Sequence, residues 1–322
     1  MKAKSSDGSA LDAQPVPSST ARRTGLCGWL AFAAVCFFWG TSGPLIRFTV
    51  RSVAPGMLVT LRFAIAGVIL YCGLWMLGRR PRLAELRQAL PFGLVLAITN
   101  VLITLGFQRV EASVGSLLLG TTALTFAVVD VCWPGHAMRP SLAVWIGLVA
   151  GLLGVATLSL EPHLFEGSKW QGMLMLEVSA WTWAVGGVAQ ARIAQRADGD
   201  HADALTSAAW QMLIAGALVS PWLWFDGFAA VARITLAGWL GIAGLIVTAS
   251  LIGFVSFIYM MQTLPAYIAG AYTYVNALVA AILSVLWLHE RLSARFYVAT
   301  LLVLGGIALI QRRSLPRPAK AE

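Results

Sequence analysis

The stretch Gly56–Leu77, GMLVTLRFAIAGVILYCGLWML, is apolar along its length apart from one charged side chain, Arg62. A helix needs about 20 apolar residues to cross the hydrocarbon core of a bilayer, and this stretch reaches that length. Hydrocarbon offers the backbone no hydrogen-bond partners, so a single segment of this kind crosses it as a helix. The stretch therefore predicts a transmembrane helix, and the rest of the chain repeats its character.

Similar apolar stretches precede and follow this one, separated by short connections that would make consecutive helices antiparallel neighbours. The predicted fold class is an all-α integral membrane protein with ten transmembrane helices. The predicted spans are roughly 26–46, 56–77, 88–108, 113–132, 141–160, 170–190, 205–225, 235–259, 266–288 and 295–311.

The composition supports this class. Hydrophobic residues make up 58% of the chain and charged residues 11%, and the mean hydropathy is +0.77. A soluble domain carries about 25% charged residues. The net charge of +9 comes from short loops, which indicates membrane topology rather than nucleic-acid binding. We therefore expect the lipid bilayer as a partner, no nucleic acid, and no metal or other cofactor. The cysteines are Cys27, Cys36, Cys72 and Cys132, and their spacing is not that of metal ligands.

The second half of the chain repeats the first. Several less common residues align at a fixed offset of 154 positions: Gln108 with Gln262, Trp133 with Trp287, and Gly151 with Gly305. Nearer the start of each half the alignment needs gaps, with Ala66-Gly67 opposite Ala215-Gly216. Because a five-helix unit is odd, its two copies insert in opposite senses, as in many secondary transporters. We predict two inverted repeats, over residues 25–160 and 165–311.

The distribution of Lys and Arg predicts the orientation. These residues concentrate in the two terminal tails and in the loops predicted on the same side of the membrane as the tails, for example Arg79–Arg87 and Arg192–Arg196. The positive-inside rule therefore places both termini in the cytoplasm. Residues 1–24 are rich in Ser, Pro and Ala and are predicted to form a disordered cytoplasmic tail rather than a cleaved signal. Residues 312–322 are predicted to form a basic cytoplasmic tail.

Several motifs resemble one known family. They are Phe38-Trp39-Gly40-Thr41-Ser42-Gly43, Leu61-Arg62-Phe63, the run Ser284–Leu292 (SVLWLHERL), and Gly305-Gly306. Together they are similar to the drug/metabolite transporter superfamily, specifically its ten-helix EamA-type permeases. The resemblance covers about residues 26–311.

This resemblance implies transport of small metabolites, usually outward, through a cavity enclosed by the first, third, fourth, sixth, eighth and ninth helices. It implies no ATPase and no prosthetic group; some members use the proton gradient and others facilitate diffusion. The sequence departs from the family in its first half, which has Pro134–Ala137 at the position where the second half has the acidic motif Leu288–Arg291. Thr122 and Asn276 also occupy positions where many relatives have proline. These departures leave the substrate open.

Glu177 is the acidic side chain set deepest in a predicted span, 170–190. An ionisable group there costs about 2.5–3.5 kcal/mol unless it is paired or faces a water-filled cavity. It could couple transport to protons or bind a substrate ammonium; a structural ion pair is the alternative. Arg62 lies at a similar predicted depth, so the two could form a charge pair. The family resemblance includes an arginine at this position, which favours a structural role for Arg62.

The remaining substrate-binding candidates are aromatic or polar residues in the middle of spans. Trp39 and Trp183 occupy matching positions in the two halves, and Ser42 precedes Gly43-Pro44, where a break would free backbone groups for a ligand. The polar candidates are Asn100, Thr121, Thr122, Gln211, Tyr259, Tyr274 and Asn276, with Tyr272 in the same segment. Interhelical hydrogen bonds explain each one singly, but their concentration in four helices favours a polar cavity.

An enzyme is excluded on chemical grounds. Gly40–Gly43 resembles the serine motif of rhomboid-type proteases, but the histidines that could serve as its base lie in loops or at helix ends. The sequence thus predicts a multi-pass inner (plasma) membrane transporter that exports a small amphipathic metabolite, such as an amino acid or its derivative, by alternating access. A carrier for a lipid or lipid-linked sugar, an uptake permease, proton coupling and a homodimer stay open. A lipid carrier should show a lateral apolar opening between helices.

Overall fold

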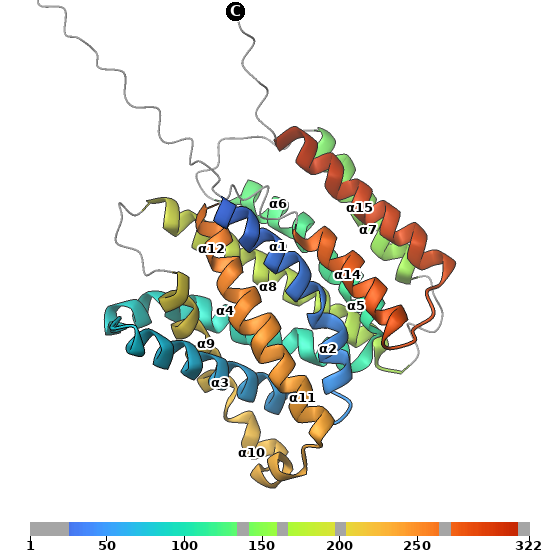
Figure 1. The fold of residues 1–322 in the computed structure, drawn as a ribbon. Coiled ribbons are helices and arrows are strands. Elements are labelled where there is room, and N and C mark those ends of the chain that lie inside the picture. Colours follow the sequence, from blue (N-terminus) through green and yellow to red (C-terminus); the bar gives the residue numbers. More distant parts are fainter. Residues whose placement is uncertain (1–25, 134–141, 160–166, 197–203, 264–271, 315–322) are drawn as a thin grey trace, which may run out of the picture.

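The computed structural model describes residues 26–133, 142–159, 167–196, 204–263 and 272–314. Within these ranges every regular element is a helix (Figure 1), which confirms the all-helical class. The elements are α1 Leu26–Gly40, α2 Ser42–Thr49, α3 Pro55–Met76, α4 Leu83–Arg109, α5 Ala112–Gly120, α6 Thr122–Cys132, α7 Leu142–Ser159, α8 Lys169–Arg196, α9 Ala204–Val219, α10 Trp222–Asp226, the 3₁₀ helix η2 Phe228–Arg233, α11 Leu236–Leu245, the π-helix η3 Ile246–Phe254, α12 Val255–Thr263, α14 Tyr272–Leu286 and α15 Ala294–Ser314.

Six helical segments of the described chain are long and apolar enough to cross a bilayer. They are Leu26–Thr49, Pro55–Met76, Leu83–Arg109, Ala112–Cys132, Ala204–Phe225 and Leu236–Met261. Two shorter apolar helices are Val275–Leu286 and Ala294–Gly306. Most of the predicted spans overlap helices of the described chain. Residues 266–271 of one span lie outside the described residues, α8 continues to Arg196, and α4 begins earlier than expected. Its polar first turn is stabilised by the Glu85 carboxylate, which accepts a hydrogen bond of 2.7 Å from the Arg82 N–H.

Two of these segments are interrupted in their middle. α1 gives way to α2 at Thr41, as predicted from Gly43-Pro44, because Pro44 lacks an N–H and its ring crowds the preceding turn. The Thr41 and Ser42 hydroxyls donate to the carbonyls of Phe38 and Trp39 at 2.7 and 2.6 Å. An unexpected second break lies at Thr121, between α5 and α6. Irregular backbone at this depth is tolerated where protein surrounds it.

The two halves of the chain pack against each other in a regular way. α3 lies along α9, α7 lies along α15, and α5 packs on α14. The contact of α4 with α8 has a counterpart in the contact of α1 with η3 and α12. Figure 1 shows α7 and α15 side by side at one flank of the bundle. A pseudo-two-fold relation between the two halves would generate this set of contacts.

Glycines set the close approach of α3 and α9. A Cβ atom on Gly216 would lie 2.7 Å from the backbone nitrogen of Ala64, and one on Gly67 would lie 2.9 Å from that of Leu213. Small residues at helix interfaces permit such approach in membranes, where packing rather than the hydrophobic effect joins helices. Gly67 and Gly216 are also the residues that the sequence alignment of the halves placed opposite each other. Each therefore serves the same contact from its own half.

One end of the bundle, which we call the Glu290 end, holds residues 47–54, 107–113, 167–169 and 287–293. There the two carboxylate oxygens of Glu290 accept hydrogen bonds from the backbone N–H groups of Ala112 and Ser113 at 2.8 and 2.9 Å. These are free donors at the start of α5, where the helix dipole also favours an anion. Glu290 thereby connects the two halves of the chain.

Two basic side chains strengthen the same end. The Arg47 Nη1 donates to the carbonyls of Phe107 and Gln108 at 2.9 and 2.7 Å, at the last turn of α4. The Lys169 Nζ lies 3.0 Å from the Glu111 carboxylate. At the opposite end, which we call the Asp130 end, Arg192 of α8 pairs with Asp130 of α6. Each end of the bundle thus has its own set of polar links between helices.

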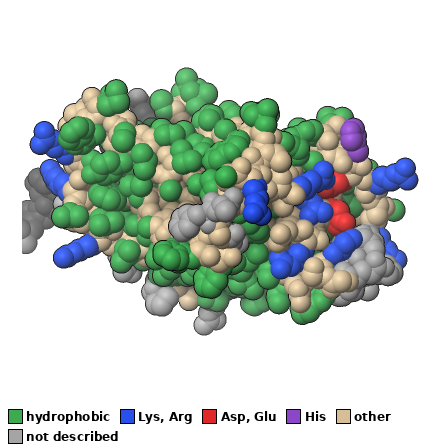
Figure 2. Space-filling model, turned by 90° about the horizontal axis from the view of Figure 1, so that it is seen from below, with side chains coloured by type: hydrophobic (Ala, Val, Ile, Leu, Met, Phe, Trp, Pro, Cys, Tyr) green, Lys and Arg blue, Asp and Glu red, His purple; other side chains and the backbone are tan. Residues whose placement is uncertain are grey.

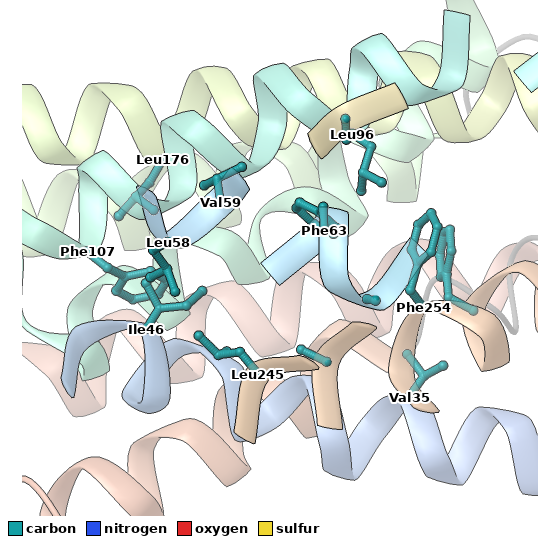
Figure 3. Packing of buried hydrophobic residues seen from close by; sticks show 14 of the residues in the cluster. Val35, Ile46, Leu58, Val59, Phe63, Leu96, Phe107, Leu176, Leu245 and Phe254 are labelled. Carbon is teal, nitrogen blue, oxygen red and sulfur yellow. The ribbon is translucent and has the colours of Figure 1, made fainter. Parts of the chain in front are cut away.

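A layer of buried apolar side chains lies just inside the Glu290 end. Ile46, Leu58, Phe107 and Leu176 come from α2, α3, α4 and α8 and are almost wholly buried. Figure 3 shows Ile46 and Leu58 close to the Phe107 ring. The outer surface is also apolar: Figure 2 shows hydrophobic side chains across most of one face, with most charged side chains towards its two sides. This distribution fits a belt of lipid around the helices.

We predict that Glu290→Ala lowers stability because it leaves two N–H donors of α5 without partners and separates the halves. Hydrogen bonds to a charged group contribute about 1.5–3 kcal/mol. Thermal unfolding of the purified protein in lipid or detergent measures the effect. Glu85→Ala is the matched control, since Glu85 caps only its own helix, and its loss should cost about 1 kcal/mol. Equal shifts for the two variants would contradict the linking role of Glu290.

The Glu111–Lys169 pair predicts a stability term that depends on pH. Burial raises the pKa of Glu111, but the Lys169 hydrogen bond and charge, a backbone hydrogen bond and the Arg47 charge together leave it below its ordinary value. A lowered pKa stabilises the fold above the unfolded pKa and loses that stabilisation as the pH falls through the folded pKa. We therefore expect the melting temperature to fall more steeply in the wild type than in Glu111→Gln as the pH is lowered from about 5 to about 3. Parallel curves would contradict the pair.

Candidate functional site

A central cavity lies between the two halves of the bundle. Its volume is about 130 Å³, close to that of a protein cavity of about 150 Å³ that holds benzene, so it has room for a small solute. It is lined from α1, α2, α3, α4, α5, α6, α8, η3 and α14. The polar and aromatic lining residues are Trp39, Ser42, Arg62, Phe63, Thr99, Asn100, Phe107, Ser116, Thr122, Ser179, Trp183, Phe254, Tyr272, Thr273 and Asn276.

Most of the residues expected at a substrate site reach this cavity. The predicted residues that line it are Trp39, Ser42, Arg62, Asn100, Thr122, Trp183 and Asn276. Thr121, Glu177, Gln211 and Tyr259 are not part of the lining. The side chain of Tyr274 lies outside the described residues. Only one face of a transmembrane helix points into the cavity, and the rotation of the helix in the bundle decides which residues lie on that face. Polar residues on the other faces therefore do not line the cavity.

An aromatic cluster forms the wall of the cavity towards the Asp130 end. The Trp39 ring is stacked on Phe257 with centroids 4.9 Å apart, and it meets the edges of Trp183 and Tyr272 at 5.8 and 5.4 Å. Phe254 lies 6.2 Å from Trp183. Such edge and offset contacts hold the rings in fixed orientations. The matching tryptophans of the two halves, predicted from the sequence, therefore meet in space.

Hydrogen bonds fix the two indole rings of this cluster. The Trp39 Nε1 donates to the Ala249 carbonyl at 2.9 Å, within the π-helix η3. The Trp183 Nε1 donates to the Tyr272 hydroxyl at 3.3 Å. Gly253 makes room for Trp39, since a Cβ there would lie 2.4 Å from the ring. The π-helix was not predicted from the sequence; π-helical turns are often found at functional sites.

Arg62 is a buried cation on the cavity wall. Its side chain is on α3 and only 7% of the residue is exposed. Its Nε donates to the Ser250 hydroxyl at 2.8 Å, and its Nη1 donates to the Asn100 amide oxygen at 3.4 Å. The guanidinium carbon lies 4.7 Å from the centroid of the Phe63 ring, a cation–π contact. All of these partners are neutral.

Glu177 is placed differently from the expected charge pair. Its two carboxylate oxygens lie 3.3 and 3.2 Å from the Thr121 hydroxyl, at the break between α5 and α6. Arg62 is instead bonded to Ser250 and Asn100. In the described part of the chain the two charges thus have separate partners, although both lie at similar depth. Depth along the membrane normal follows from the sequence, whereas adjacency depends on helix packing.

Two more candidates face away from the cavity. The Gln211 Nε2 donates to the Ser207 hydroxyl one turn earlier on α9, at 2.8 Å. Tyr259 on α12 is 38% exposed at the surface of the bundle. Asn276, by contrast, lines the cavity, and with its amide nitrogen turned towards α1 it donates to the Cys36 carbonyl at 2.7 Å. It therefore joins α14 to α1 at the level of the aromatic cluster.

Several lining residues were not singled out from the sequence. These are small hydroxyl residues, Thr99, Ser116, Ser179 and Thr273, together with apolar rings such as Phe107 and Phe254. Ser116 packs against Gly43, where an added Cβ would lie 2.5 Å from its hydroxyl oxygen. Thr99 could have been found as the neighbour of Asn100. Serine and threonine are otherwise common in membrane helices, so their presence alone carries little signal.

We predict that Gly253→Ala disturbs the cavity wall by displacing the Trp39 ring and breaking its bond to Ala249. Overpacking of this kind typically costs about 1–3 kcal/mol. Gly73→Ala is the matched control, because nothing lies within 4 Å of a Cβ at that helical position. It should be neutral or slightly stabilising, since alanine favours helix by about 1 kcal/mol over glycine. Thermal unfolding of the two purified variants measures the effect. A Gly253→Ala variant as stable as the wild type would contradict the close packing of Gly253 against Trp39.

Comparison with known proteins agrees with this architecture. The chain is 27% identical over 294 residues to the "Uncharacterized inner membrane transporter YedA" of Escherichia coli (strain K12), covering 90% of this chain and 92% of that protein. It is 25% identical over 301 residues to the "Uncharacterized transporter YvbV" of Bacillus subtilis (strain 168), covering 91% and 94%. A protein of known crystal structure superposes with a TM-score of 0.63 at 20% identity, covering 89% and 98%, and so shares the fold.

The sequence profile of one family matches the chain twice. The profile of the EamA-like transporter family covers residues 26–160 and again residues 170–312, which together are most of the chain. The family resemblance inferred from Phe38–Gly43, Leu61–Phe63 and Ser284–Leu292 is thereby confirmed. A helical bundle with a central cavity and no soluble domain in its described part fits the same family. The chain belongs to the EamA-like transporter family, and is a transporter rather than an enzyme.

Proposed function

We propose that this protein is a secondary transporter of the inner (plasma) membrane that exports a small amphipathic metabolite, such as an amino acid or its derivative, by alternating access. The central cavity carries this proposal, because it combines polar side chains with an aromatic wall at the interface of the two halves. Substrate sites of such transporters lie near the midplane, between repeats. The name of the relative YedA supports the inner membrane as the location.

In this proposal the chain crosses the membrane ten times as two inverted repeats, over residues 25–160 and 165–311. Two observations support the repeats: the family profile matches twice, and α3, α5 and α7 each pack on their counterparts α9, α14 and α15. Both termini are cytoplasmic, as the distribution of Lys and Arg favours. The Glu290 end then faces outwards and the Asp130 end faces the cytoplasm.

Alternating access requires each end to open in turn. At the Glu290 end, opening would separate Glu290 from the start of α5 and part the apolar layer around Phe107. At the Asp130 end, it would separate Arg192 from Asp130 and part the aromatic cluster. The helix breaks at Thr41 and Thr121 lie between these two closures and offer points at which the halves of a helix can move separately.

Hydrogen-bond accounting at Thr121 supports proton coupling through Glu177. The Thr121 hydroxyl has one hydrogen, and its shortest contact, 2.6 Å, is to the Leu118 carbonyl, which can only accept. The same hydroxyl is also the donor towards the two Glu177 oxygens, at 3.3 and 3.2 Å, so Leu118 and Glu177 compete for one hydrogen. Protonation of Glu177 would remove this competition. An ionised carboxylate would draw the hydroxyl hydrogen away from Leu118, at the break between α5 and α6.

No charged group of the neighbouring helices compensates Glu177 among the described residues. On α4, the Arg109 guanidinium contacts the Leu105 carbonyl and the Met175 sulfur, one turn nearer the Glu290 end. On α6, Asp130 is paired with Arg192. A carboxyl group in such surroundings gains or loses its proton with a change in local structure, which is what a coupling site requires.

A carrier for lipids or lipid-linked sugars is the second candidate, because the bundle has an apolar lateral groove. Leu94, Ile98 and Val101 of α4 line it with Leu218 of α9 and Trp222 of α10. The groove and the central cavity have no lining residue in common. A lipid headgroup in the groove would therefore not reach the polar cavity without movement of α4. The central cavity is the better candidate for the transported solute.

The function is tested by profiling metabolites in the spent medium of cells in which the gene is deleted or overexpressed. A compound that rises outside on overexpression and falls on deletion identifies the substrate and the outward direction. The opposite changes would support an uptake permease. If the media are indistinguishable, export of a soluble metabolite is contradicted, and lipid movement in proteoliposomes becomes the next measurement.

We predict that Glu177→Gln abolishes transport driven by an imposed pH gradient while the protein still accumulates in the membrane. The glutamine amide can donate to Thr121 in place of a protonated carboxyl, but it cannot release a proton. Flux of the identified substrate into proteoliposomes, with and without the gradient, measures the effect. Glu85→Gln is the control and should keep the response. A full response to the gradient in Glu177→Gln would exclude this coupling site.

A further inference from the structure

The charge of Arg62 is not balanced by any group of the cavity wall. The lining contains Arg62 but neither Asp nor Glu. The acidic groups nearest in the fold are already engaged elsewhere: Glu177 with Thr121, Glu111 with Lys169, and Glu290 with the start of α5. A buried cation in a membrane protein is costly unless an anion or several dipoles compensate it. The described residues supply only neutral dipoles.

The guanidinium also has donors to spare. It carries five N–H groups, of which the Nε–H is bonded to Ser250 at 2.8 Å and one Nη1–H makes a long bond to Asn100 at 3.4 Å. The other three have no acceptor among the described residues, and the side chain lines the cavity. Ser250 and the stacked Phe63 ring hold the planar group in place. The guanidinium is therefore held in place on the cavity wall with N–H donors that a ligand could use.

We propose that Arg62 binds the carboxylate of the transported solute, and that the aromatic cluster around Trp39 holds the solute's apolar part. This assignment rests on the proposed transport function and narrows its substrate class to small amphipathic monocarboxylates. Arginine suits the task because its fork matches the two oxygens of a carboxylate. Asn100 also lines the cavity, and its amide nitrogen has a second hydrogen beyond the one donated to the Leu96 carbonyl.

The charge balance selects a monoanion over other ligands. One guanidinium neutralises one carboxylate, whereas a phosphate monoester would bring a second negative charge into a wall that has no second cation. A cationic solute would add its charge to that of Arg62. A zwitterion finds no carboxylate for its ammonium group, which would have to rely on the faces of Trp39 or Trp183. The carboxylate should therefore contribute more to binding than any amino group.

Four compounds with one carbon skeleton test this ranking on the full-length protein in lipid nanodiscs. They are 3-phenylpropanoate, 3-phenylpropanamide, phenylalanine and phenylalaninamide; binding is followed by quenching of tryptophan fluorescence. We expect both carboxylates to bind about 10- to 100-fold more tightly than their amides. Phenyl phosphate should bind more weakly than 3-phenylpropanoate. Equal binding of acid and amide, tighter binding of the phosphate, or no binding of the acid would overturn the proposal.

Variants assign the preference to Arg62. Arg62→Met should bind acid and amide equally, and Arg62→Lys should keep part of the preference for the acid. Arg51→Met is the control and should match the wild type, since Arg51 is an exposed arginine beyond α2. A preference that survives in Arg62→Met would overturn the assignment. If Arg62→Met does not fold, the ratio of acid to amide binding in Arg62→Lys decides, because a lysine cannot present the fork: an unchanged ratio contradicts the proposal.

Transport measurements separate this inference from the proposed function. Counterflow of labelled 3-phenylpropanoate in proteoliposomes, dependent on Arg62, would support both. Carboxylate binding that depends on Arg62 without any transmembrane movement would keep the anion site and contradict the transport proposal. If neutral or cationic solutes move across the membrane equally well in the wild type and in Arg62→Met, the transport proposal stands and the anion site is overturned.

Discussion

The whole structure depends on the lack of hydrogen-bond partners for the backbone in hydrocarbon. Every regular element of the described residues is a helix. The two mid-span interruptions, at Thr41 and Thr121, occur where protein surrounds them and side-chain hydroxyls donate to nearby carbonyls. The same constraint concentrates function. Polar groups are affordable only where they face one another or a cavity, so the breaks, the buried Arg62 and the carboxyl of Glu177 all lie in the middle of the bundle, around the interface of its halves.

The second organising feature is the near symmetry of that interface. Gly67 and Gly216 serve the same contact from opposite halves, and Trp39 and Trp183 meet in one aromatic cluster. The departures from symmetry are as informative. Glu290 closes one end by accepting from the start of α5, whereas the corresponding segment of the first half, Pro134–Ala137, has no acidic residue and lies outside the described residues. The two ends of the bundle are therefore closed by different chemistry, which gives each its own energetic cost of opening.

The separation of Arg62 from Glu177 changes the view of the site. As a charge pair the two residues would suit a zwitterionic substrate, but each has its own surroundings. Arg62 is on the cavity wall among neutral groups, and Glu177 lies against Thr121 at the helix break. In our proposals, solute recognition and proton exchange therefore lie in different places. The link between them is the α5–α6 segment, since Gly120 and Thr122 line the cavity while Thr121 contacts Glu177. A change at Glu177 can thus reach the cavity through a single residue.

The sequence by itself determined the helical class and the family, and it predicted the spans and the internal duplication, because each depends on the composition of a continuous segment or on motifs within it. It also found many cavity residues, such as Trp39, Asn100, Trp183 and Asn276, since polar and aromatic residues in mid-span are rare enough to be informative. It could not exclude Gln211 and Tyr259, find Ser179, or foresee the π-helix beside Trp39. Only the tertiary structure decided those points, along with the partners of Arg62 and Glu177. The physical reason is that hydropathy fixes depth along the membrane normal, whereas the rotation of each helix and the identity of its neighbours arise from side-chain packing across the whole bundle.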